Sequence, residues 1–346
     1  MYKKIFVSNR MGLGDVILTT PILKALKQKY PDSRITFVTS PNCLPIVQGL
    51  DFIDEVITYE KHVDSVWKVV KKIWRYDLAL CIDFKYRSAV MAFLAGIPIR
   101  AGLKHKRKLF LTHPVDKPLK WENTYEPLNF AYVLKQSVGI EFDADFTRLY
   151  IPETSTSERN AVDEMLAAQG IKGGSPYIVL APVTSWLPKD WLEDRYVELV
   201  RSLIEEYSYP VVLLVAPSDA EKVVKLDKLD GVVNLMGKTT VMQMVEIIRR
   251  ANLLIGGCSG PLHIAGATET PFVALYGPTS PREWAPKTKG VIISHGDRFP
   301  CSPCLVEMVG CPEKPCMQAI SVQEVFGACR QMLLESSVHR DGHELS

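Results

Sequence analysis

The chain has 346 residues, of which 47% are hydrophobic and 23% are charged, and this composition is typical of globular rather than disordered proteins. The 41 Lys and Arg residues nearly balance the 39 Asp and Glu residues, so no strong overall field favours a nucleic-acid ligand. The longest charge-free apolar stretch, residues 89–99, is far shorter than the roughly 18 residues that cross a bilayer. Because the N-terminal residues also lack the pattern of a signal peptide, we expect a cytoplasmic protein.

Short apolar runs rich in β-branched residues alternate with helical patterns in the first half of the chain. This alternation is typical of a parallel sheet that helices cover on both faces. The predicted strands are Lys4–Ser8, Arg34–Thr39, residues 55–59 and residues 77–84, and the predicted helices are residues 15–30 and 63–74.

The alternation breaks near Ile151. Residues 152–157 are polar and begin with a proline, and Thr156 or Ser157 is a suitable N-cap for a following helix. At roughly 150 residues per domain, the length of the chain predicts about two domains. We therefore predict two domains, 1–160 and 161–346, rather than one large sheet, because the break is long, polar and near the middle.

After the break the alternation begins again. A closing helix is expected last, with the option that it packs back on the first domain. The predicted strands are residues 177–181, 211–216, 232–236, 252–255 and 272–276, and the predicted helices are residues 194–207, 241–250 and 321–334. The sequence therefore predicts an α/β protein with two Rossmann-like, doubly wound domains that face a central cleft.

The loop after the first strand is the first candidate for chemistry, because ligands of open parallel sheets bind beyond the carboxyl ends of the strands. Gly12 and Gly14 would let the backbone of this loop approach a ligand closely. Asp15 falls at the expected start of a helix, where the helix dipole stabilises a carboxylate. Two interpretations of Asp15 stay open, a helix N-cap and a general base that is unprotonated near neutral pH.

Two loops of the second half also follow predicted strands. In residues 181–191, Thr184 and Ser185 offer hydroxyls, and Lys189 offers a point charge suited to phosphate oxygens. A lysine with no function in an exposed loop is the alternative. The rigid loop 276–286 has two interpretations: it contacts the phosphate group that Lys189 would bind, or it is only a stiff connection.

The loop after the strand 252–255 consists mostly of small residues. Ser259 is a suitable N-cap, Gly260 leaves the backbone bare, and Pro261 fits the first helical turn. Free N–H groups at such a helix start bind anions, and a diphosphate is the natural ligand, although simple capping requires the same residues. His263 falls inside this helix, where a core or supporting role is favoured over a catalytic one.

Residues 100–108 contain the one local excess of positive charge. They form either a solvated loop or a surface for an anionic partner, such as a phosphorylated lipid or a membrane. Lys104, Lys106 and Arg107 belong to this segment, and Arg87, which follows the fourth strand, is a further candidate for the same surface.

Eight cysteines are present. Four of them have the spacing C-x2-C-x6-C-x4-C, which is able to hold zinc in a structural site. Because this spacing is tighter than that of paired zinc knuckles, we favour reduced thiols or a facultative disulfide over a metal. The clustered cysteines are Cys301, Cys304, Cys311 and Cys316, and the scattered ones, predicted to be buried thiols, are Cys43, Cys81, Cys258 and Cys329.

Four motifs keep one order and spacing along the chain: GLGDVILTTPILKALKQKYPDSRI from Gly12, T-S-x-x-x-K-D-W from Thr184, NLMGKTTVMQM from Asn234, and CSGPLHIAGATETPFVALYGPTSP from Cys258. Together they resemble glycosyltransferase family 9, the ADP-heptose:lipopolysaccharide heptosyltransferase group, from about residue 4 to residue 334. The resemblance implies a GT-B fold, with a lipid-linked oligosaccharide acceptor on the first domain and a nucleotide-sugar donor such as ADP-heptose on the second. It also implies an inverting transfer that requires no metal or other cofactor. We further expect a monomer with peripheral contact to the inner membrane.

The resemblance also implies roles for single residues. Asp15 matches the general base of the family, Lys189 with the hydroxyls before it matches the diphosphate-binding residues, and Glu221 falls near those that bind the ribose. The expected donor-binding residues are Thr184, Ser185, Lys189, Glu221, Cys258, Ser259, Gly260, Pro261 and His263. The expected acceptor-binding residues are Gly14, Arg87, Lys104, Lys106 and Arg107.

One departure from the family pattern concerns the phosphate-binding turn. The family begins it with Asp-Ser-Gly or Asp-Thr-Gly, whereas this chain has Cys258 before Ser259 and Gly260. The missing carboxylate normally lies near the donor sugar, so the change implies a different sugar, reduced activity or a compensating group. The alternative function is therefore an impaired homologue that only binds a nucleotide sugar or glycolipid. An NAD-dependent oxidoreductase is disfavoured, because the GxGxxG fingerprint is absent.

Overall fold

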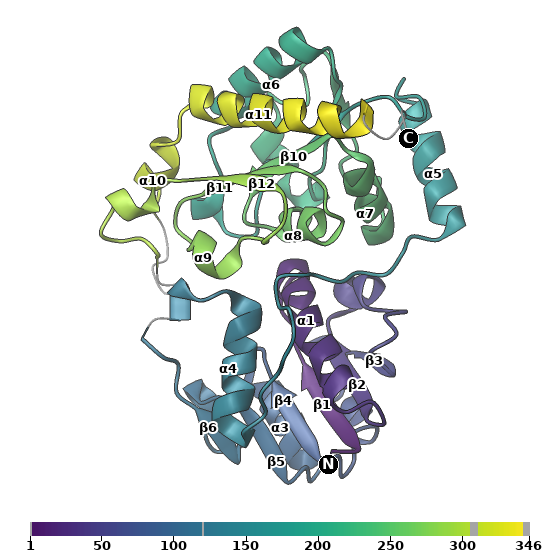
Figure 1. Cartoon of the computed structure of the whole chain (residues 1–346), viewed down its shortest axis with the longest axis vertical. Helices are drawn as coiled ribbons and strands as arrows, with labels where there is room; N and C mark the ends of the chain where they lie inside the picture. Colours follow the sequence, from purple (N-terminus) through teal and green to yellow (C-terminus); the bar gives the residue numbers. More distant parts are fainter. Residues whose placement is uncertain (1, 120, 305–310, 342–346) are drawn as a thin grey trace. The chain divides into compact units, whose positions relative to one another are not determined.

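The computed structural model describes residues 2–119, 121–304 and 311–341. The chain forms two compact units, Met1–Pro152 and Glu153–Ser346, and each contains one sheet with its own helices (Figure 1).

The second unit begins just before helix α5 (Thr156–Ala167). The N-cap of α5 is Ser155, whose side chain forms a capping box with Glu158, so neither Thr156 nor Ser157 caps the helix as expected. A division at residue 160 would cut this helix, whereas the observed division leaves it whole.

The first unit is built on a six-stranded sheet with the order β3-β2-β1-β4-β5-β6. Every neighbouring pair of strands is parallel. The strands are β1 (Lys4–Ser8), β2 (Arg34–Thr39), β3 (Glu55–Thr58), β4 (Leu78–Cys81), β5 (Ile99–Leu103) and β6 (His113–Val115). The helices are α1 (Leu13–Lys29), α2 (Trp67–Val70), α3 (Tyr86–Leu94) and α4 (Glu126–Val138).

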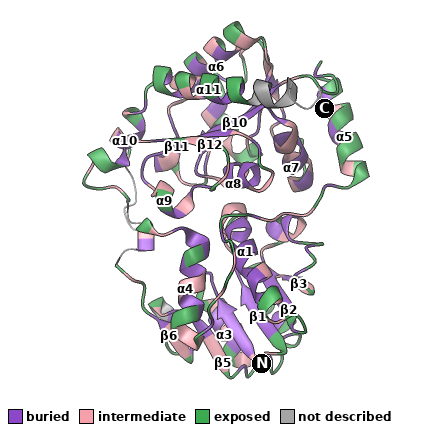
Figure 2. Ribbon diagram, in the orientation of Figure 1, coloured by how far each residue is buried: buried purple, intermediate pink, exposed green. Residues whose placement is uncertain are grey.

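The core of this unit lies on β1 and β4, the two central strands. All four residues of β4 are buried, and only the first residue of β1 is exposed. Helix α1 is buried continuously from Val16 to Leu23, and Figure 2 shows these elements in the colour of buried residues. Strands covered on both faces are apolar throughout instead of alternating, which explains why these strands were predictable.

Two predicted segments of the first unit fold differently. The expected helix over residues 63–74 is reduced to the single turn α2, because only Val69, Val70 and Ile73 of its apolar residues are buried in the core. The first half of the basic segment 100–108, for which a solvated loop was one interpretation, belongs to strand β5. Its Gly102 permits close pairing with β4, since a Cβ at this position would lie 2.7 Å from the carbonyl oxygen of Cys81.

The second unit repeats the architecture of the first, with the parallel order β12-β11-β10-β7-β8-β9. Its strands are β7 (Ile178–Ala181), β8 (Val211–Leu213), β9 (Val232–Asn234), β10 (Leu253–Gly257), β11 (Phe272–Tyr276) and β12 (Gly290–Ser294). Besides α5, its helices are α6 (Glu193–Tyr207), α7 (Val241–Arg250), α8 (Gly260–Ala267), α9 (Pro281–Trp284), α10 (Pro315–Gln318) and α11 (Val322–Asp341).

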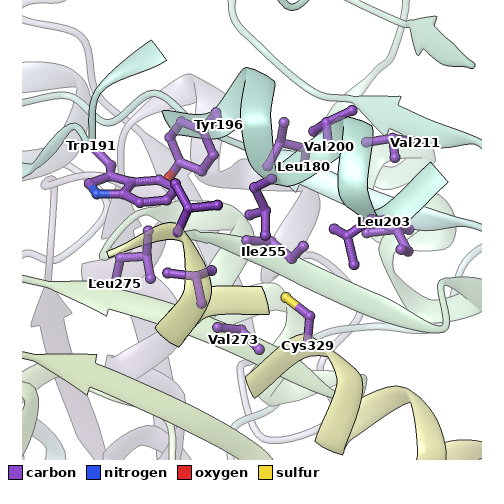
Figure 3. Packing of buried hydrophobic residues seen from close by; sticks show 14 of the residues in the cluster. Leu180, Trp191, Tyr196, Val200, Leu203, Val211, Ile255, Val273, Leu275 and Cys329 are labelled. Atoms are coloured by element: carbon purple, nitrogen blue, oxygen red, sulfur yellow. The ribbon is translucent and has the colours of Figure 1, made fainter. Parts of the chain in front are cut away.

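The closing helix α11 packs on its own unit, against α6 and strands β10 to β12. Its Cys329 is buried in the same hydrophobic cluster as Val273 and Leu203 (Figure 3). These contacts make α11 part of the core of the second unit. The rings of Trp191 and Tyr196 pack edge to face in this cluster, with their centroids 4.8 Å apart. They fix the end of the loop after β7.

Candidate active site

The strand order places the candidate loops of the second unit next to each other. Strands β7 and β10 are neighbours in the sheet, but the chain leaves them toward opposite edges. Such a point, where the order reverses, is where ligands of doubly wound sheets bind. The loop with Thr184 and Lys189 follows β7, and the turn with Cys258 and Ser259 follows β10.

These two loops are in direct contact. The ammonium nitrogen of Lys189 donates a hydrogen bond to the main-chain oxygen of Cys258 at 2.9 Å. Gly257 permits this approach, because a Cβ there would lie 3.0 Å from the methyl group of Thr184 and 3.3 Å from the main-chain oxygen of Lys189. The two loops that the sequence singled out, one with Lys189 and one with Ser259, are thus in contact in the folded chain.

The turn itself leads into helix α8. Ser259 is its N-cap residue, yet its hydroxyl makes no capping hydrogen bond and lies 3.3 Å from the main-chain oxygen of Gly257. Gly260 and Pro261 occupy the first two helical positions. Because the side chain does not cap the helix start, its N–H groups and the positive end of its dipole suit an anion.

The loop that carries Lys189 is held by Asp190, a residue whose role the sequence did not reveal. Its carboxylate accepts a hydrogen bond from the main-chain N–H of Thr184 at 2.7 Å, and burial raises the pKa of this carboxyl. Thr184 is itself buried, and its hydroxyl donates to the main-chain oxygen of Trp186. Thr184 therefore shapes the loop, whereas Ser185 is exposed.

His263 lies on α8 close to this lysine. Its side chain is buried, and its Nδ1 has no hydrogen-bond partner among the described residues. Burial, with a smaller effect from the charge of Lys189, lowers the pKa of His263 from 6.5 to about 3. The imidazole is therefore neutral at physiological pH and contributes no charge to an anion site.

We expect His263 to make the stability of the chain depend on pH. Between about pH 3 and 6.5 the unfolded chain binds a proton at this residue and the folded chain does not. The free energy of unfolding should therefore fall as the pH falls from 6.5, by at most about 1.4 kcal/mol per pH unit from this group. Urea unfolding at pH 7, 6 and 5 should show a weaker pH dependence for His263→Asn, while His62→Asn, at an exposed histidine, should behave like the parent chain. Equal slopes in all three proteins would contradict this expectation.

Glu221 is exposed in the 3-10 helix Pro217–Val223, beyond β8. Its neighbour Lys222 lies 3.9 Å from the carboxylate of Asp190. This places the segment that carries Glu221 beside the Lys189 loop.

In the first unit, Asp15 lies in the first turn of α1 and Gly14 directly precedes it. Asn9 fixes this turn: its amide nitrogen donates to the main-chain oxygen of Asp15 at 3.1 Å and to the hydroxyl of Thr19 at 2.8 Å. Asp15 does not serve as the N-cap, which is Gly12. The rival interpretation of Asp15 as a helix N-cap is therefore wrong.

The basic segment 100–108 is largely occupied by internal contacts. Arg107 is fully buried and donates to the main-chain oxygens of Cys81, Asp83 and Leu103. The expectation that Arg107 contributes to an exposed acceptor surface is therefore wrong. Lys104 forms an ion pair with Asp116, and the side chain of Lys106 lies outside the described residues.

The clustered cysteines adjoin the donor-side loops. The N–H of Cys304 donates to the main-chain oxygen of Pro278 at 2.7 Å. Burial raises the pKa of Cys304 to about 11, helped by Cys301 nearby, so this thiol is protonated at neutral pH. Within the parts of the chain that the structure describes, no group of three or more His, Cys, Asp or Glu side chains is placed to hold a metal ion.

Comparison with known proteins identifies the family. The model of glycosyltransferase family 9 (heptosyltransferase) matches residues 65–315, which is well over half of the chain. The chain belongs to glycosyltransferase family 9. Lipopolysaccharide heptosyltransferase 3 of Escherichia coli K12 is 24% identical over 95% of this chain and 97% of its own length. Lipopolysaccharide heptosyltransferase 2 of the same strain is 25% identical over 80% and 84%.

Solved structures share the fold of this chain. A glycosyl transferase family 9 protein of Veillonella parvula superposes with a TM-score of 0.81 at 24% identity, over 96% of this chain and 98% of that one. E. coli ADP-heptose lps heptosyltransferase II gives a TM-score of 0.77 at 24% identity, over 96% and 99%. This family 9 glycosyltransferase therefore has the GT-B fold, with two Rossmann-like units. Among its described helices, none has the length and apolar character needed to cross a bilayer.

Proposed function

We propose that this glycosyltransferase transfers a heptose, or a related sugar, from an ADP-sugar to an acceptor in the lipopolysaccharide core. Its relatives are named lipopolysaccharide heptosyltransferases, and one similar structure is an ADP-heptose enzyme. The observation that carries the proposal is the 2.9 Å contact between Lys189 and the main chain of the turn at Cys258. It unites an ammonium group and a helix start, which together suit a diphosphate.

On the donor side, we assign the diphosphate to Lys189 and to the N–H groups that begin α8 at Gly260. Ser259 and Ser185 offer hydroxyls to its oxygens, and Pro261 fixes the first turn of the helix. Glu221 is the proposed partner of the ribose. His263, which is buried and neutral, supports the helix from within.

The proposed reaction is a single displacement. The acceptor hydroxyl attacks the anomeric carbon, its proton passes to the Asp15 carboxylate, and the bond from that carbon to the diphosphate oxygen breaks. Attack from the face opposite the leaving group inverts the anomeric configuration. Negative charge grows on the departing ADP, and Lys189 and the N-terminus of α8 stabilise this charge. We propose that these two groups supply the positive charge that a divalent cation provides in other transferases.

We further propose that the enzyme is a monomer in peripheral contact with the membrane that carries its lipid-linked acceptor. Trp67, Trp74 and Leu109 of the first unit support this contact, because they are large apolar side chains that stay at least half exposed. Aromatic side chains of this kind favour the interface between lipid and water.

A panel of nucleotide sugars tests the proposed function. Saturating ADP-heptose should raise the melting temperature by about 5 °C, and UDP- and GDP-sugars should not. Mass spectrometry should then detect heptose on a lipopolysaccharide core acceptor. The same binding and transfer assays on Cys258→Asp distinguish an impaired homologue from an active enzyme. Donor binding without transfer in both proteins would overturn the proposed activity and favour a binding protein.

A further inference from the structure

A pocket of about 440 Å³ opens at the carboxyl edge of the sheet in the first unit. Its lining comes from the segments that follow four neighbouring strands, β1 to β4: Arg10, Ser40–Asn42, Tyr59–Lys61 and Phe84–Arg87. The pocket therefore spans the point where the strand order reverses, between β1 and β4. Of the acceptor-binding residues expected from the sequence, it contains Arg87 alone.

Arg10 is the buried cation of this pocket. Its side chain is only 6% exposed, and its guanidinium lies 5.1 Å from the ring of Tyr59. The Nε atom is 3.3 Å from the hydroxyl of Ser88 and 3.5 Å from the carboxylate of Asp83. The Nη2 atom is buried and has no hydrogen-bond partner among the described residues. A buried charged donor without an acceptor is rare in proteins.

Asp83 does not satisfy this donor, because other groups share its carboxylate. The hydroxyls of Ser8 and Ser88 and the main-chain N–H groups of Arg10 and Lys85 all donate to it, at 2.8 to 3.1 Å. This network holds Arg10 in place and leaves its Nη2 atom without a partner among the described residues. A ligand oxygen is the group that this atom lacks.

The rest of the lining indicates the charge of the ligand. Lys61 and Lys85 are exposed, and Arg87 lies 5.1 Å from the ring of Tyr86. Glu60 is the one carboxylate among the lining residues. Cations therefore outnumber anions around the pocket, and the exposed ring of Tyr86 lies beside them. This combination suits a sugar that carries an oxyanion.

We propose that this pocket binds an oxyanionic substituent of the acceptor saccharide, either a phosphate monoester or a carboxylate, and that Arg10 determines specificity for it. The inference rests on the proposed function, because Arg10 lies in the short loop between β1 and α1, the helix whose first turn carries Asp15. An anion held by Arg10 would orient the acceptor relative to that carboxylate. Arg10 has no part in the proton transfer.

Steady-state kinetics with three matched acceptors tests the proposal: one with a phosphate monoester, one with a carboxylate, and one neutral. The parent enzyme should have a KM at least tenfold lower for one of the anionic acceptors, which also identifies the anion. Arg10→Lys keeps a cation beside Asp83 but loses the guanidinium fork. It should raise that KM about tenfold and leave the KM for the neutral acceptor unchanged. Lys71→Gln, at an exposed lysine outside the pocket, is the control for net charge.

If no transfer is detected with any donor, a direct measurement of ligand binding still tests the proposal. Titration calorimetry of the full chain with mannose 6-phosphate, glucuronate and mannose should show binding of an anionic sugar but not of mannose. Arg10→Lys or Arg87→Gln should weaken that binding about tenfold. Two results would overturn the proposal: no preference for either anionic sugar, or equal losses for charged and neutral ligands. In the latter case Arg10 only holds the loop after β1 in place through Asp83 and Ser88.

Discussion

Replacement of Asp15 by alanine is expected to lower kcat at least 100-fold, because a general base contributes about 10²- to 10⁴-fold to such reactions. The Kd for ADP should stay unchanged, since the diphosphate is assigned to Lys189 and α8 on the second unit. Quenched-flow or coupled kinetics gives kcat, and calorimetry gives the Kd. The main-chain oxygen of Asp15, which accepts from Asn9 and Thr19, is present in any variant, so the start of α1 should remain intact.

Asp15→Asn is the matched control for shape. It preserves the size of the side chain but is not basic, so it should be as inactive as the alanine variant. Asp54 is another carboxylate of the same unit, and it forms an ion pair with Lys27. Asp54→Asn should therefore retain full kcat. An Asp15→Asn enzyme with parental kcat would remove Asp15 from the mechanism.

Replacement of Lys189 by methionine is expected to lower kcat/KM for the ADP-sugar by about 10²- to 10³-fold, the range measured when a group that stabilises developing negative charge is removed. Methionine keeps most of the side-chain length without the ammonium. Part of the loss should appear as weaker ADP binding, because the ammonium also faces the diphosphate in the ground state. Initial rates across donor concentrations, with ADP titration, separate the two contributions.

Lys222→Met provides the comparison for Lys189. Lys222 lies 2.7 Å from Asp219 and 3.9 Å from Asp190, so its removal changes the charge near the same loop without removing the proposed phosphate ligand. It should change kcat/KM less than threefold. If both variants lose activity equally, the general positive potential of this region matters and not the position of Lys189.

The sheets were predictable because their central strands are buried on both faces. Lys4–Ser8 and Phe272–Tyr276 have the predicted bounds, since short, nearly continuous apolar runs leave few alternatives. The prediction of a helix over residues 63–74 was wrong. A helical spacing of apolar residues does not show whether those residues are buried against a core. Strand β5 was hidden within a segment whose charges suggested a loop, and its pairing depends on Gly102 and a distant strand.

The candidate site was predictable where it depends on the carboxyl ends of strands that are neighbours in the sheet. Lys189 and the turn at Ser259 follow β7 and β10, and the rule for open sheets brings such segments together. Arg10 and Asp83 were missed, because their network joins residues far apart in sequence through buried side chains. The charge of Arg107 suggested a surface role, yet three main-chain oxygens bind its guanidinium inside the fold.

The bond between Lys189 and residue 258 has a consequence for evolution of the turn. The ammonium contacts a peptide oxygen, and every amino acid carries that atom. Mutation can therefore exchange the side chain at this position without removing the acceptor atom that holds Lys189 against the turn. The cysteine found here is therefore compatible with the proposed diphosphate site, because that site depends on the main chain of residue 258 and not on its side chain.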